Sequence, residues 1–381
     1  MTNDQNLETV PVSSSRDMRE FIRLPHAIYA DDPHWVPPLD LERKEHLSRK
    51  NPFFGHGEAQ LFLVRRDGRT VGRISAQVNR LHLERYDDAT GFFGFLEAVE
   101  DEAVFRTLFE AAENWLRERG MKHVRGPFSY SINEESGLLV EGFEHPPVIM
   151  MGHARPWYGP MVEACGYGKV MDLIAYILRG LEPMPEAAMK LLRRLKEKGR
   201  LTVRPLNRKR LREELDLIMD IFNDAWADNW GYVPFTEAEI RKLGDDLNMI
   251  VDERDVWIAS LDGEPSAMVV TLPDINEWIR DFGGRLLPFN WAKLIWRLKF
   301  GGPPKTVRMP LMGVRRKYHG KAVGSALALA VIDAARDYHS GRGVQQGELS
   351  WILETNRPTR KLIETLGGEP YKTYRVYEKA L

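Results

Sequence analysis

The sequence predicts an α/β protein built from two tandem domains that share one fold. Three observations lead to this prediction: an internal repeat, the same order of helices and strands in both halves, and a glycine-containing loop between an apolar strand and an amphipathic helix. The chain has 381 residues, of which 43% are hydrophobic, so it is long enough for two ordinary domains with separate cores.

Three weak matches connect the two halves of the chain. The paired segments occur in the same order and at nearly the same offset, as expected of a duplicated fold. One pair reads as a strand, an Asp-Gly turn and a second strand, which is typical of a β-hairpin. The matched segments are 34–38 with 231–235, 61–74 with 256–269, and 161–176 with 362–377. We therefore expect a first domain at 1–180, a helical linker at 181–203 and a second domain at 204–381.

The second copy shows the element pattern most clearly. Residues 306–314 form a largely apolar run that predicts a strand. Leu327, Val331 and Tyr338 then recur at helical spacing, which predicts an amphipathic helix. Another strand at 348–354, a helix ended by glycine and a closing strand follow. We expect a mixed, mostly antiparallel sheet flanked by helices in each copy.

The composition excludes several classes of protein. Lys and Arg total 54 against 55 Asp and Glu, so no global field favours nucleic acid, and we expect no nucleic-acid partner. Cys165 is the only cysteine, which excludes a disulfide framework or a multi-cysteine zinc site, and we expect no metal. The polar N-terminus lacks the pattern of a secretory signal, and no run of about 18 apolar residues occurs. We expect a cytoplasmic protein.

The stretch YHGKAVGSAL, residues 318–327, lies between the predicted strand and helix. Backbone N–H groups and the positive end of a helix at such a place can hold a pyrophosphate. Gly320 and Gly324 permit close approach of the backbone, and Lys321 adds a positive charge. For an isolated motif, an ordinary strand-to-helix turn is the alternative interpretation.

In this stretch the sequence resembles the GNAT superfamily of acyl-CoA-dependent N-acyltransferases, whose motif ends in Q/R-x-x-G-x-G/A. His319 stands at the Q/R position and Ala322 at the first motif glycine, so the pattern departs at two places. The segment ELSWILETNRPTRKLIETLGGEPYKTYRVYEK then follows in GNAT order. The resemblance implies acyl-CoA as co-substrate. The residues expected to hold it are Met312, Gly313, Val314, His319, Gly320, Lys321, Ala322, Val323, Gly324, Ser325 and Asn356.

The first copy departs from this pattern where the phosphate loop should be. Its helix opens with Glu100, Asp101 and Glu102, whose carboxylates would repel a pyrophosphate. We therefore expect the first domain to be a degenerate copy and the second to bind CoA. GPFSYSINEESGLLVEGFEHPPVIMMGHARPWY, NDAWADNWGYVPFT and ELSWILETN look like a bacterial tandem GNAT family that includes the ceramide synthases. That resemblance implies transfer of a fatty acyl group from a thioester to the amine of a long-chain sphingoid base.

The chemistry implied by the GNAT resemblance is direct attack of an amine on a thioester, with a carboxylate as base. Glu348 and Glu354 lie at the two ends of ELSWILE, and Glu354 is favoured because it is two residues from Asn356. A helix-capping role for Glu354 is the alternative. We assign no general acid, since Ile363 stands where many GNAT relatives carry a tyrosine.

Four further polar or aromatic residues are candidates for acceptor contacts. Loops rich in such side chains often form substrate walls, although turns, caps and core packing are the alternatives. The candidates are Asn133 and Glu134 in the first domain, and Asn229 and Trp230 in the second.

Residues 277–300 form a segment rich in tryptophan between the second hairpin and the phosphate-loop strand. Trp291, Leu294, Ile295 and Leu298 recur at helical spacing, with basic residues on another face. Basic amphipathic helices with tryptophan are typical of bilayer interfaces, whereas an ordinary core-facing helix is the alternative. We expect a flap, with Trp291 and Trp296 as substrate contacts, that borders an acyl tunnel and touches the inner membrane.

Other functions remain open from the sequence. Acetylation of a small soluble amine is one, and a non-catalytic acyl-CoA sensor, suggested by Ala322 and Ile363, is another. An enzyme that uses aminoacyl-tRNA would need a basic channel, which the charge balance does not support. An acyl carrier protein is the alternative acyl donor.

Overall fold

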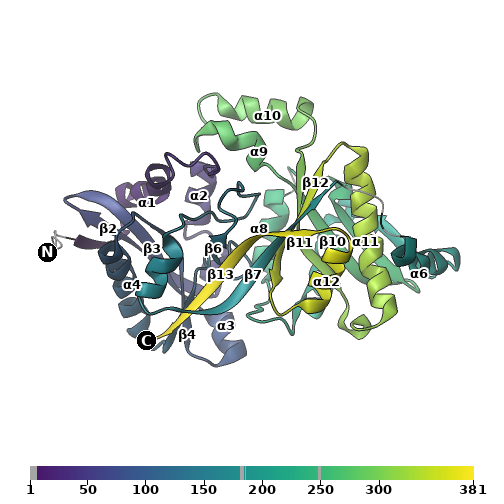
Figure 1. Cartoon of the computed structure of the whole chain (residues 1–381), viewed down its shortest axis with the longest axis horizontal. Coiled ribbons are helices and arrows are strands. Elements are labelled where there is room, and N and C mark those ends of the chain that lie inside the picture. The colour runs from purple at the N-terminus through teal and green to yellow at the C-terminus, as the bar shows by residue number, and fades with distance from the viewer. Residues whose placement is uncertain (1–6, 181–183, 185, 248–249) are drawn as a thin grey trace. The chain divides into compact units, whose positions relative to one another are not determined.

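The computed structural model describes residues 7–180, 184, 186–247 and 250–381, and its fold is α/β (Figure 1). The chain forms two compact units, each of which is discontinuous. Unit 1 comprises Met1–Ile174, Ile279–Leu294 and Lys372–Leu381, and unit 2 comprises Ala175–Trp278 and Ile295–Tyr371. These two units are defined by contacts within the folded chain, whereas the domains expected at 1–180 and 204–381 are defined by the sequence repeat. The boundaries of those two domains therefore stay a prediction.

Unit 1 is a sheet with helices on both faces. Its strand order is β1-β2-β3-β4-β5-β13-β7, with β6 against β13, and of the pairs with a described register only β4 with β5 is parallel. The strands are β1 (Leu7–Pro11), β2 (Gly57–Arg66), β3 (Arg69–Asn79), β4 (Thr90–Ala98), β5 (His123–Gly126), β6 (Leu138–Glu141), β7 (Gly168–Arg179) and β13 (Glu369–Ala380). The helices are α1 (Ser15–Ile28), α2 (Asp40–His46), α3 (Arg80–Tyr86), α4 (Glu102–Arg117) and α5 (Tyr158–Ala164), with a 3-10 turn η1 (Pro52–Gly55).

Unit 2 repeats this plan with the order β7-β12-β11-β10-β9-β8, in which β11 and β12 are parallel. Its strands are β8 (Leu201–Pro205), β9 (Val256–Leu261), β10 (Glu264–Pro273), β11 (Thr306–Val314) and β12 (Gln346–Leu353). Its helices are α6 (Glu186–Glu197), α7 (Leu211–Trp226), α8 (Glu237–Leu247), α11 (Ala322–Gly341) and α12 (Arg357–Thr365). Between β10 and β11 the chain forms α9 (Asn276–Ile279) and α10 (Asn290–Phe300). Short 3-10 turns are η2 (Arg208–Arg210), η3 (Glu253–Asp255), η4 (Arg280–Phe282) and η5 (Arg316–Tyr318).

The local geometry confirms the internal repeat. The hairpins β2-β3 and β9-β10 both turn at an Asp-Gly pair with positive φ at both residues, 49° and 75° in the first and 52° and 83° in the second. Two consecutive positive φ values match the twist of the flanking strands. Gly166 and Gly367, which precede β7 and β13, share a φ of 88°. The helix α6 lies in the range expected to be a linker, of which residues 181–183 and 185 lie outside the described residues.

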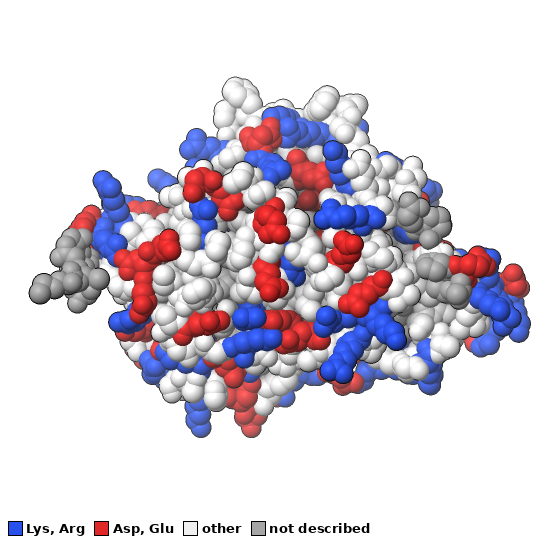
Figure 2. Space-filling model, viewed as in Figure 1, with Lys and Arg blue, Asp and Glu red and all other residues white. Residues whose placement is uncertain are grey.

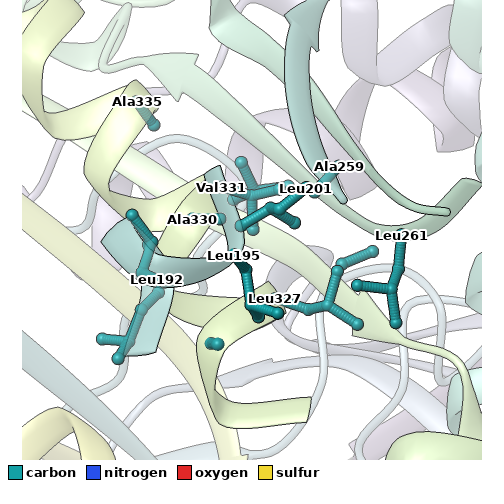
Figure 3. Close-up of a cluster of buried hydrophobic side chains, with 13 residues drawn as sticks. Leu192, Leu195, Leu201, Ala259, Leu261, Leu327, Ala330, Val331 and Ala335 are labelled. Atoms are coloured by element: carbon teal, nitrogen blue, oxygen red, sulfur yellow. The ribbon is translucent and has the colours of Figure 1, made fainter. Parts of the chain in front are cut away.

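The core of unit 2 explains why α11 is fixed against the sheet. Alternate residues of β10 point to opposite faces, as in any strand. Ala267 and Val269 therefore join the cluster formed with α11, while Met268 lies near Gly313 on the α7 side. Figure 3 shows leucines of α6 meeting alanine, valine and leucine side chains of α11 in this cluster. Small residues on α11 allow this close packing, so the start of the helix is held firmly at the end of β11.

No helix among the described residues is both long enough and apolar enough to cross a bilayer.

Candidate functional site

The loop from β11 to α11 is ordered by its own backbone. After Val314 the chain makes the 3-10 turn η5 and enters α11 at Ala322. His319 folds back, and its Nε2 donates a hydrogen bond to the Val314 carbonyl oxygen at 2.7 Å. Gly320 has a φ of 71°, a left-handed conformation that glycine adopts without strain. A Cβ on Gly324 would lie 2.2 Å from the Tyr318 carbonyl oxygen, so only glycine permits this approach.

The start of α11 has the properties of an anion site. The first N–H groups of an α-helix lack intrahelical acceptors, and here no side chain caps them. The helix is 20 residues long, and its positive end favours negative charge. Lys321, the N-cap residue, is exposed and makes no ion pair in the described residues. The three preceding basic residues are each paired, Arg315 with Asp220, Arg316 with Asp224 and Asp228, and Lys317 with Glu264.

The equivalent helix start in unit 1 is already occupied by a carboxylate. Asp101 caps α4, and its Oδ1 accepts a hydrogen bond from the Ala103 N–H at 2.9 Å. Arg66 forms an ion pair with the same carboxylate. This geometry agrees with the expectation that acidic residues keep a pyrophosphate away from the first copy.

The parallel strands β11 and β12 part beside this loop. Their register pairs Thr306 to Met309 with Gln346 to Leu349 and ends there, although β11 runs on to Val314. Pro310 has no N–H to donate at the point of divergence. Beyond this point on β11 the Met312 carbonyl oxygen accepts a hydrogen bond from Trp226 Nε1 of α7 at 2.9 Å. The predicted cofactor residues on β11 therefore lie where the two strands have separated.

The two candidate bases occupy different environments. Glu348 is fully buried, and its Oε2 is 3.3 Å from Nε of Arg308, which is itself 2% exposed. The Arg308 guanidinium also lies over the Trp351 ring, 4.7 Å from its centroid. This arrangement is that of a buried ion pair within the sheet. Glu354 follows β12 and is half-buried, and its carbonyl oxygen accepts a hydrogen bond from Arg360 at 3.1 Å.

The helix cap next to Glu354 is Asn356. Its side-chain oxygen accepts a hydrogen bond from the Thr359 N–H at 3.3 Å and opens α12. The structure therefore gives the helix-capping role to Asn356. Ile363, which stands where relatives carry a tyrosine, is 5% exposed and packs inside unit 2.

The candidate acceptor residues fall into separate groups. Asn229 and Trp230 lie in the loop after α7, where the Asn229 N–H donates a hydrogen bond to the Trp226 carbonyl at 2.8 Å. Trp226 stacks on Phe222 and reaches β11, so it is part of the wall of unit 2. Trp291 and Trp296 are on α10 and are 48% and 59% exposed.

Glu134 belongs to a charged cluster in unit 1 that the sequence did not reveal. Its Oε2 is 2.8 Å from Nε2 of His46, and Arg43 is 3.0 Å from Glu135. The His46 ring stacks on Tyr130, with centroids 5.5 Å apart and planes 5° from parallel. Burial lowers the pKa of His46, but the Glu134 carboxylate outweighs this effect, so the pKa is raised above 6.5. The acidic residues of SINEES indicated the carboxylates of this cluster, but nothing in the sequence indicated that the basic residues of α2 pair with them.

Comparison with known proteins gives two full-length relatives and a similar fold. The chain is 46% identical to "Bacterial ceramide synthase" of Caulobacter vibrioides over 100% of this chain and 99% of that protein. It is also 46% identical to "Protein YghO" of Escherichia coli over 97% and 94% of the two chains. A solved tandem GNAT protein from the clavulanic acid biosynthesis pathway covers 98% of both chains, with a TM-score of 0.57 at 14% identity, and so shows the fold alone. No protein-family model matches the chain.

Proposed function

The chain belongs to the family of the bacterial ceramide synthase, and on this premise we propose that it transfers a fatty acyl group from acyl-CoA to the amine of a long-chain sphingoid base. It is an N-acyltransferase of the GNAT type. The predicted fold, two tandem GNAT-like α/β domains with a degenerate first copy, is confirmed. The acceptor, the donor and the catalytic residues belong to the proposal.

The observation that carries the proposal is the uncapped start of α11. The first N–H groups of α11 have no side-chain cap, Lys321 makes no ion pair within the described residues, and the chain turns closely at Gly324. Together these features offer a pyrophosphate hydrogen-bond donors and positive charge. Met312, Gly313 and Val314 flank the gap between β11 and β12 into which the pantetheine arm would extend. His319, Gly320, Ala322, Val323, Ser325 and Asn356 complete the proposed CoA contacts.

We propose direct transfer with Glu354 as base. The neutral amine attacks the thioester carbon, a C–N bond forms, and the C–S bond then breaks. The carboxylate of Glu354 takes the proton that the amine loses, and the departing thiolate is stable enough to leave without an assigned acid. Glu348 is the weaker candidate, because its full burial against Arg308 favours a structural role. Asn133, Glu134, Asn229 and Trp230 are the proposed acceptor contacts.

We further propose a cytoplasmic enzyme that contacts the inner membrane through α10 and the turn before it. Six of the eight large apolar side chains that are exposed among the described residues lie there. They are Leu287, Phe289, Trp291, Ile295, Trp296 and Phe300, with exposed fractions from 43% to 80%. In Figure 2 pale side chains project at the top of the view, where Figure 1 places α10, with basic side chains beside them. Such a surface suits an anionic bilayer interface.

The other face of this segment explains its stability away from a membrane. Leu286 and Leu294 pack against the small cluster of Val36, Ile279 and Phe282. The apolar stripe expected from the sequence is therefore split, because Leu294 packs inward while Trp291 and Ile295 are exposed. A variant with Trp291, Trp296 and Phe300 changed to serine should lose binding to anionic vesicles. Leu41→Ser, which removes a residue 61% exposed on α2, should not, and equal binding by all three proteins would refute the membrane contact.

The function is tested by thiol release from a panel of acyl-CoAs, with and without a sphingoid base, followed by mass spectrometry of the lipid extract. Thiol release that depends on the base and yields an amide supports the proposal. Turnover of acetyl-CoA with small soluble amines alone would favour the acetyltransferase. Saturable acyl-CoA binding without turnover would favour the sensor, and turnover only of acyl carrier protein thioesters would change the donor.

A further inference from the structure

Unit 2 contains an apolar cavity of about 340 Å³ that the phosphate loop does not explain. It lies on the α11 and α12 side of the sheet, next to the first residues of β11 and β12. Apolar lining residues include Val307, Met309, Ile332, Ala335, Leu349 and Leu366. The cavity is open to solvent on one side and mostly apolar, so it can take an apolar occupant. The volume falls within the range of small-molecule sites.

Among the polar side chains that line this cavity, Arg179 is exposed, and the others described here are engaged with other protein groups. His339 donates from Nε2 to Thr271 Oγ1 at 2.8 Å, and the Thr271 hydroxyl in turn donates to the Asp255 carbonyl oxygen at 2.7 Å. Arg336 is bound by Asp333 at 2.9 Å and Asp337 at 2.6 Å. Glu348 is paired with Arg308. A polar ligand would have to break these bonds, whereas a hydrocarbon chain would leave them intact.

The cavity begins where the two parallel strands part. Met309 and Leu349 are partners in the last pair of the β11 and β12 register, and both line the cavity. Beyond this pair lies the gap proposed for the pantetheine arm. A thioester held in the gap would therefore have the cavity directly beside its acyl group.

We propose that this cavity holds the hydrocarbon chain of the acyl donor, so that its walls set the length of the chain that is transferred. The inference rests on the proposed acyl-CoA site. A methylene group is similar in size to a water molecule, which takes about 30 Å³, so the space suits a chain of roughly ten carbons or more. Apolar cavities that exclude water are known to take up apolar molecules.

Two substitutions in the wall should shift chain-length preference in opposite directions. Ala335→Leu fills part of the cavity from α11, and Leu349→Ala enlarges it from β12. Each methylene that loses its apolar contact should lower kcat/KM about fourfold, so Ala335→Leu should select chains several carbons shorter. Leu349→Ala should extend the preferred length. Ala334→Leu is the matched control, because its side chain neighbours Ala335 on α11 but does not line the cavity.

The assay compares kcat/KM for acyl-CoAs from four to eighteen carbons in the three variants and the parent. Opposite shifts for Ala335→Leu and Leu349→Ala support the inference, as does an Ala334→Leu profile that keeps the parental optimum. If kcat/KM falls by the same factor at every chain length in both wall variants, the inference about the cavity is wrong, while the proposed N-acyl transfer still stands. If Ala335→Leu fails to fold, Leu349→Ala alone decides.

Binding provides a readout that does not need turnover. The acyl chain should make dodecanoyl-CoA bind the parent at least a hundredfold more tightly than CoA, and Ala335→Leu should remove most of this difference. Equal affinity of the parent for the two ligands would refute the cavity as the acyl site. If the parent turns over no acyl-CoA at all, the proposed function fails, and this comparison still decides what the cavity holds.

Discussion

Replacement of Gly324 by alanine tests whether the start of α11 binds the pyrophosphate. The added methyl would lie 2.2 Å from the Tyr318 carbonyl oxygen and 3.0 Å from its carbon, which are backbone atoms that no rotamer change can move. The same carbonyl accepts the Lys321 N–H at 3.2 Å, so a shift of either segment disturbs the N-cap. We expect the first turn of α11 to move away from η5.

The magnitude follows from two opposing terms. Overpacking costs typically about 1–3 kcal/mol, and alanine in a helix recovers about 0.5–1 kcal/mol relative to glycine. The net loss of stability is therefore modest, on the order of 1 kcal/mol, which the protein should survive. A charge-assisted hydrogen bond contributes about 1.5–3 kcal/mol, so loss of one such bond to phosphate should weaken CoA binding about tenfold or more.

Gly341→Ala is the matched control for this prediction. It makes the same substitution at the last residue of the same helix, where a Cβ would meet nothing within 4 Å. Calorimetric titration with CoA should give a weaker Kd for Gly324→Ala and an unchanged Kd for Gly341→Ala, with melting temperatures measured in parallel. A folded Gly324→Ala protein that binds CoA as well as the parent would refute the assignment of the loop.

Two further predictions concern titratable groups in unit 2. Glu354→Gln should lower kcat with little change in melting temperature. Glu348→Gln should leave Arg308 buried without its counter-ion and cost about 3 kcal/mol or more of stability. If instead Glu348→Gln lowers kcat and Glu354→Gln lowers stability, the base is Glu348. Burial, and then the charge of Arg342, holds the pKa of His339 at about 4, below its ordinary 6.5. Its neutral form is thus favoured by folding, so His339 should contribute a loss of stability of up to about 3 kcal/mol as pH drops from about 6.5 to 4. Asp255, 3.6 Å away, opposes this loss in the parent, because burial raises its pKa to about 6. His339→Gln should lose less melting temperature over this window, and parallel curves for parent and variant would contradict the account.

The features predicted from sequence are those encoded by short segments. The Asp-Gly hairpins and the strand, loop and helix around Gly324 depend on local backbone preferences, and the structure contains them. The repeat could be found because each copy carries its own turns. The sequence indicates that Lys321 adds a positive charge, but only the structure shows that carboxylates of other elements neutralise the three basic residues before it.

The features that sequence reasoning missed depend on contacts between distant segments. The closing strand β13 pairs with β5, and the local sequence pattern of β13 does not specify this partner. The His46 and Glu134 pair joins a short helix to a loop far along the chain. The acyl cavity arises where β11 and β12 diverge, a property of packing that no local pattern announces.

The two copies use equivalent helix starts in opposite ways, and this contrast bears on the role of unit 1. At α4 the Asp101 carboxylate accepts a hydrogen bond from the Ala103 N–H and places a negative charge at the helix start, whereas no side chain caps the start of α11. Buried ion pairs contribute little to stability on balance. In unit 1 the Glu134 carboxylate is already paired with His46, and the Tyr130 ring is stacked between His46 and Phe53. This charged cluster therefore holds α2 against the SINEES loop, and the anion site of α11 has no counterpart in the first copy.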